Sequence, residues 1–223
     1  MNFLTHYIID KTDDIYHNIG LTLPDVIVLH NRGVGFRQKT AAQLCGSDIP
    51  DDFRRMCQAM MRHFRLDKWF HSSEFFSSSV TFIQNEFHRL TGGHIAFYYA
   101  HILLEILIDR HILTIHPDLH RMFYAEYERF NFDTIVHHFE NVKNFDRVKF
   151  IDFCDLFAHS TFLYGYSDKH DIINSLHKVT RRMGLEISFS CEESIAADAV
   201  DEVFYAMQPS FDSCIAEAKS IAW

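Results

Sequence analysis

The stretch GHIAFYYAHILLEILIDRHIL, residues 93–113, predicts the central helix of the protein. Almost every residue in it outside His101, Glu105 and Asp109 is apolar or aromatic, and a helix that is apolar on most sides is buried in a core. The three polar residues are spaced four apart, which places them along one face. Residues 93–113 therefore predict a core helix that carries a row of imidazole and carboxylate groups.

A carboxylate at position 105 of such a helix needs a partner. Burying ionised Glu105 alone would cost several kcal/mol or force it to bind a proton. A paired cation, a hydrogen-bond network or a metal ion would each relieve that cost. A metal ion would use both residue types of the row, because neutral imidazole and carboxylate oxygen are ligands of zinc, iron, manganese and nickel.

A second stretch, RHFRLDKWFHSSEF at residues 62–75, repeats the same spacing. His63, Asp67 and His71 are four apart and lie on the apolar stripe of a helix that is expected to start after Pro50. Two helices thus present similar rows, and we expect the two rows to form one metal site. A solvated ion pair or a capped core histidine is the alternative interpretation of such spacing.

The composition favours a single all-α domain over residues 1–223. The chain has 223 residues and 26.3 kDa, enough for one sizeable core, with 48% hydrophobic residues and 22 Phe. Its 8 Gly and 4 Pro are too few for the many turns of an all-β fold. We expect about eight to ten helices, with no internal repeat or low-complexity linker.

Charge and cysteine usage exclude several classes of protein. A net charge of −9 without a run of like charges does not suit nucleic acid or an anionic membrane. Five scattered cysteines without a Cys-x-x-Cys pair indicate free thiols in a reducing compartment. The start MNFLTHYIIDKTDD is not typical of a signal peptide, and the longest apolar run is too short to span a bilayer. We therefore expect a cytoplasmic protein.

Glycine and proline suggest several helix boundaries. Gly20 is expected to end a first surface helix, and Pro24 to open the next one, with Asp25 beside its N-terminus. The segment 132–142 has apolar residues at helical spacing and predicts a core helix. Pro209 separates two closing segments, 192–207 and 210–222, which form one or two helices.

Several segments, in order, resemble one known family. They are MNFLTH at residues 1–6, GLTLPD at 20–25, HFRLD at 63–67 and FLYGYSDKHDIINSLHKVTRRMG at 162–184. Together they resemble the acyl carrier protein phosphodiesterase family, whose fold is related to the HD-domain metal phosphohydrolases. The resemblance implies an HD-domain-like helical bundle.

The chain departs from the pattern of this family at five positions. Leu21 stands where the family has asparagine, and His71 stands where it has aspartate. The later helix of the family carries an aspartate and then an Asp-His pair, and the matching positions here are His101, Glu105 and Ile106. Imidazole in place of carboxylate lowers the negative charge of the site and shifts its preference from manganese toward zinc, nickel or iron.

The resemblance implies a metal-dependent phosphodiesterase that cleaves a link such as that between 4′-phosphopantetheine and acyl carrier protein. One or two divalent ions (Mn, Fe, Ni or Zn) would polarise the ester and activate water. Asp67 and Arg65 are the predicted catalytic residues, and Arg110 is predicted to bind phosphate. The predicted metal ligands are His6, Asp25, His63, Asp67, His71, His101 and Glu105.

Two other functions remain open at this point. The His-rich ligand set also suits a di-iron oxygenase on the same scaffold. Alternatively, the site binds metal structurally or is inert, and the protein is not an enzyme. A phosphate-ester substrate, possibly acyl carrier protein, is the predicted partner, and the many phenylalanines make a homodimer plausible.

Overall fold

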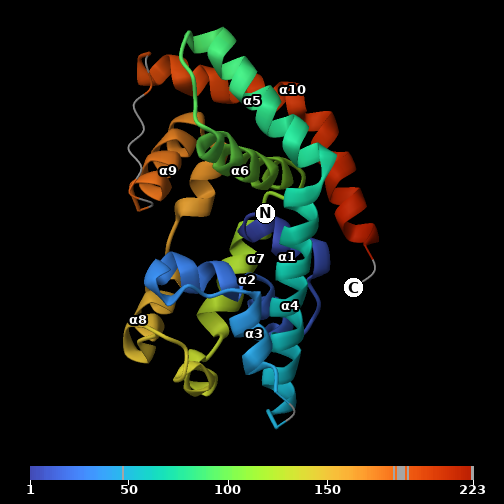
Figure 1. Ribbon diagram of the computed structural model, residues 1–223, viewed down its shortest axis with the longest axis vertical. Coiled ribbons are helices and arrows are strands. Elements are labelled where there is room, and N and C mark those ends of the chain that lie inside the picture. The colour runs from blue at the N-terminus through green and yellow to red at the C-terminus, as the bar shows by residue number, and fades with distance from the viewer. Residues whose placement is uncertain (47, 183, 185–188, 190, 222–223) are drawn as a thin grey trace.

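The described part of the protein is built from helices alone (Figure 1). The computed structural model describes residues 1–223 except 47, 183, 185–188, 190 and 222–223. The predicted domain 1–223 and the predicted helix over 210–222 therefore extend in part outside the described residues. Within the described residues there is no β-strand, which confirms the all-α prediction.

The chain forms ten α-helices and four short 3₁₀ helices in its described part. The α-helices are α1 (Phe3–Asp10), α2 (Ile15–His30), α3 (Gln38–Leu44), α4 (Asp51–Ser72), α5 (Glu74–Thr91), α6 (Phe97–Ile115), α7 (Leu119–Arg129), α8 (Arg147–Ala158), α9 (Lys169–Arg182) and α10 (Glu193–Ser220). The 3₁₀ helices are η1 (Arg32–Val34), η2 (Phe132–Thr134), η3 (Val136–Phe139) and η4 (Phe162–Ser167).

Helix α6 lies at the centre of the upper half of the molecule, as its sequence predicts (Figure 1). It contacts α1, α5, α9, α10 and η4, and eleven of its residues are buried. Helix α4 runs beside α2 through the lower half and leads into α5 at Ser73. The Ser73 side chain caps the N-terminus of α5. The start of the chain lies where α1, α4 and α6 meet (Figure 1).

Gly20 and Pro24 lie inside α2, so the predicted boundary between two helices there was wrong. Gly20 is a site of close helix packing: a Cβ atom at this position would lie 2.5 Å from the Met56 carbonyl oxygen of α4. Glycine is used here because it lets two backbones approach, not because the chain turns. Asp25 consequently lies in the middle of a helix and not at its N-terminus.

Two other expectations about helices also need correction. Residues 132–142 form short 3₁₀ turns, η2 and η3, in place of one core helix, and Asn131 caps the first by accepting from the Asp133 backbone N–H. Phe132 and Ile135, like Phe139 and Val142, are buried three residues apart, which suits the tighter 3₁₀ turn. Helix α10 continues through Pro209, because buried side chains on both sides of it keep their helical spacing.

Among the described residues, none of the helices combines the length and the apolar character that crossing a membrane requires.

Candidate metal centre

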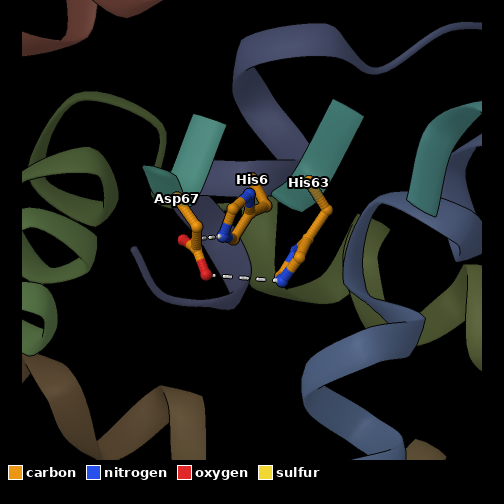
Figure 2. Close-up of side chains that lie close together, drawn as sticks. All are labelled: His6, His63 and Asp67. Carbon is orange, nitrogen blue, oxygen red and sulfur yellow. Dashed lines mark hydrogen bonds and ion pairs between the residues drawn. The ribbon is translucent and has the colours of Figure 1, made fainter. Parts of the chain in front are cut away.

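Two histidines and an aspartate from α1 and α4 form the first candidate ligand group, which we call the inner group (Figure 2). His6 comes from α1, whereas His63 and Asp67 lie one turn apart on α4. The two imidazole rings are stacked with their centroids 3.9 Å apart, and His6 Nε2 lies 3.1 Å from Asp67 Oδ1. Both histidines are buried.

The hydrogen bond of His63 Nδ1 orients the ring so that Nε2 can bind a cation. Its Nδ1 lies 2.9 Å from the carbonyl oxygen of Leu21, to which only an N–H can donate. In the neutral ring, Nε2 therefore carries a lone pair. This atom lies 3.6 Å from both Asp25 Oδ1 and Asp67 Oδ2, which also bear lone pairs. Acceptors that face one another without a proton repel, and a metal ion between them removes the repulsion.

Burial keeps the two inner histidines in the neutral form that binds metal. It lowers the pKa of His6 to about 4, helped by the neighbouring His63 ring. Burial also lowers the pKa of His63. Both rings are thus unprotonated at neutral pH, and a deprotonated nitrogen is the state that ligates a metal.

The two carboxylates of this region differ in their proton affinity. Burial alone would raise the pKa of Asp67, but the Met1 amino group and the two histidines hold it well below its usual range. Burial raises the pKa of Asp25 to about 7. Asp67 is therefore the carboxylate that stays ionised, whereas Asp25 exchanges protons close to neutral pH.

A second group, which we call the outer group, joins the end of α4 to the first half of α6. His71 Nε2 lies 3.0 Å from His101 Nε2 and 3.3 Å from Glu105 Oε1, and His101 Nε2 lies 2.9 Å from the same oxygen. These three atoms lie close enough to one another to hold one metal ion. The rings of His71 and His101 pack edge-on against Phe76 at 5.0 and 4.9 Å, which fixes their orientation.

The inner and outer groups adjoin each other. The amino group of Met1 lies 2.7 Å from Asp67 Oδ1 and 3.1 Å from Glu105 Oε1, so one positive nitrogen contacts a carboxylate of each group. This charge also holds the pKa of Glu105 well below its usual range, against the effect of burial. The seven predicted ligands therefore lie in one region, where six of them form two groups in place of the single site that the two rows predicted, and Asp25 lies 3.6 Å from His63 of the inner group.

Asp109 belongs to neither ligand group, although it lies one turn from Glu105 on α6. Its carboxylate is fully buried and accepts from the backbone N–H of Leu4 at 3.1 Å and from the N–H and hydroxyl of Thr5 at 2.8 and 2.6 Å. Asp109 thus anchors the N-terminal end of α1 to α6. By holding α1 it positions His6, a role that helix spacing alone did not reveal.

We expect Asp109→Asn to lower the free energy of unfolding by about 1–2 kcal/mol, because one of three buried donors loses its acceptor. The inner group should also bind metal more weakly, since α1 carries His6. Urea unfolding and zinc titration of the variant measure the two effects. Thr180→Val is the control: Thr180 is equally buried and bonds only within α9, so it should lower stability and leave metal affinity unchanged.

Arg65, predicted to be catalytic, and Arg110, predicted to bind phosphate, both lie outside the two ligand groups. Arg65 is two residues from both His63 and Asp67, and side chains two apart on a helix do not face each other. Its side chain is exposed and donates to the Met61 carbonyl oxygen. Arg110 is buried, pairs with Asp201 at 2.7 Å and lies over the ring of Phe204, so its guanidinium ties α6 to α10.

Sequence reasoning also missed the carbonyl of Leu21, which sets the tautomer of His63. The signal for it was Gly20, which lets α2 approach α4 closely enough for this bond.

No protein-family model, curated protein or solved structure matches the chain.

Proposed function

We propose that the protein is a metal-dependent phosphodiesterase of the HD-domain-like type, with its catalytic ion held by His6, His63 and Asp67. The convergence of His63 Nε2 with the Asp25 and Asp67 carboxylates carries this proposal, because a buried imidazole lone pair there faces one oxygen of each carboxyl group at 3.6 Å. The resemblance of four sequence segments to the acyl carrier protein phosphodiesterase family supports the same reaction. In that family the substrate is the phosphodiester that joins 4′-phosphopantetheine to its carrier protein.

His63, Asp67 and Asp25 would have different roles in hydrolysis. A bound divalent ion would supply Lewis-acid polarisation of the phosphoryl oxygen and a water of lowered pKa. His63 is held in its ligating tautomer by Leu21, and Asp67 stays ionised to balance the charge of the ion. Asp25 lies 3.6 Å from His63 and its pKa is raised to about 7 by burial, so its carboxylate is suited to accept a proton from water.

The test is a hydrolysis assay on protein stripped of metal and reloaded with Mn²⁺, Fe²⁺, Ni²⁺ or Zn²⁺. Bis(p-nitrophenyl) phosphate, p-nitrophenyl phosphate and holo-acyl carrier protein represent a simple diester, a monoester and the family substrate. We expect diester cleavage with at least one metal. Asp25→Asn should lower kcat by about 10²–10⁴-fold, the usual contribution of a general base.

Asp25→Asn should retain its metal, which separates a catalytic defect from a binding defect. Asp212→Asn is the control, because Asp212 is an exposed carboxylate paired with His111 on another face of α6. Intact esters with every metal, in protein shown to bind that metal, would contradict the proposed reaction.

A second candidate function is that of a di-iron oxygenase. It is favoured by the composition of both groups, since two histidines and one carboxylate with open positions are typical of non-haem iron oxygenases. Oxygen consumption by the iron-loaded protein, without ester cleavage by any metal form, would select it over the hydrolase.

We further propose that the protein works in the cytoplasm. All five cysteines are free, which supports a reducing compartment.

A further inference from the structure

The outer group, His71, His101 and Glu105, has its own complete set of ligand atoms. Its three interatomic distances span 2.9–3.3 Å. Ligands at about 2.0–2.2 Å from a zinc-like ion lie ~3.0–3.4 Å from one another in four- or six-coordinate geometry. The three atoms therefore already have the spacing of neighbouring ligands, and protons on the two rings can satisfy at most two of the three contacts among them.

The outer group differs from the inner group in access and in charge. The side chains of His71, His101 and Glu105 are 35%, 23% and 18% exposed, whereas in the inner group the two histidines are each 1% exposed and Asp67 is 25% exposed. The outer group has one carboxylate, and the inner group has Asp67 with Asp25 close by. An ion in the outer group thus has a direct path to solvent, and it lacks the additional carboxylate that Asp25 places beside the inner group.

The framework of the outer group is rigid. His101 and Glu105 are one turn apart on α6, and His71 lies in the last turn of α4. Phe76 contacts both imidazoles, and Phe97 packs against Phe76 and His101 at 6.2 and 6.1 Å. Ring orientations fixed by packing lower the ordering cost of binding an ion.

We infer that His71, His101 and Glu105 hold a second, independently exchanging ion of the zinc, nickel or cobalt class. This inference deepens the proposed function, because it assigns the outer group a separate ion beside the catalytic one. Imidazole-rich sites favour late first-row transition metals, whereas carboxylate-rich sites suit manganese. The outer ion is expected to load and leave without disturbing the inner one.

The experiment counts bound zinc by elemental analysis before and after brief dialysis against a mild chelator. Wild-type protein should bind two ions and lose one of them rapidly. His71→Ala/His101→Ala should keep the slow ion and lose the fast one, with the affinity of the fast site reduced by more than the ~100-fold that loss of an outer-shell partner can cost. His63→Ala should show the reverse pattern. The ion that each variant retains also shows that the variant is folded.

The matched control removes a pair of exposed histidines that is not part of either ligand group. His88 and His94 are stacked at 4.1 Å on the surface, so His88→Ala/His94→Ala tests for adventitious zinc on imidazole pairs. The inference is overturned if this control loses the fast ion, or if wild type binds one ion that both the inner and the outer variant lose. A fast ion at the outer group without any slow ion would support the inference and contradict the proposed catalytic site instead.

Discussion

Asp67→Asn should abolish the thermal stabilisation that an ion in the inner group gives to the protein. A ligand at 100 times its Kd adds about 2.7 kcal/mol to the free energy of unfolding. For a chain of this length that corresponds to a rise in Tm of about 5–10 °C. Asp67 contacts His6, His63 and the Met1 amino group, so its carboxylate is the common element of the inner group. The asparagine variant should show almost none of this rise, and its ester hydrolysis should fall to background.

Differential scanning calorimetry with and without Mn²⁺ or Zn²⁺ measures the effect, in a His71→Ala/His101→Ala background that removes the outer ion. Asp212→Asn removes an exposed carboxylate and should keep the full rise in Tm. A full rise in Asp67→Asn as well would mean that the ion binds elsewhere, and the inner group would then be a buried ion-pair network.

Gly20→Ala should destabilise the protein by about 3 kcal/mol, which is the upper end of the usual cost of overpacking. The added Cβ would lie 2.5 Å from the Met56 carbonyl oxygen, 2.8 Å from Ala59 Cβ and 3.0 Å from Met56 Cα. Most of these atoms are backbone, so α2 and α4 must separate. That separation moves the Leu21 carbonyl away from His63, and metal affinity should fall together with stability.

Urea unfolding of the metal-free variant gives the stability change, and zinc titration gives the loss of affinity. Gly46→Ala is the matched control, because a Cβ there meets nothing within 4 Å and should leave both quantities unchanged. Wild-type stability in Gly20→Ala would contradict the close approach of the two helices.

The local pattern of residues was sufficient to predict the main helices of the site. The apolar run after Gly93 predicted α6, and Pro50 predicted the start of α4. The pairs that lie one turn apart, His63 with Asp67 and His101 with Glu105, were also predictable, because spacing on a helix fixes their distance.

The grouping of ligands around each ion was not predictable in this way. His63 and His71 are eight residues apart, which is about 12 Å along a helix and too far for one ion. The last residue of each predicted row, His71 or Asp109, therefore contacts groups on another helix. His71 meets His101 on α6, and Asp109 meets the backbone of α1.

The sequence by itself thus determined an all-α fold, a buried central helix and two pairs of candidate ligands, since these depend on periodicity along one helix. Only the tertiary structure decided that the ligands form an inner and an outer group, that Asp109 anchors α1, and that Arg110 belongs to the contact with α10. The physical reason is that these relations depend on how helices cross. Crossing is set by packing between segments distant in the chain, such as the fit of Gly20 against α4.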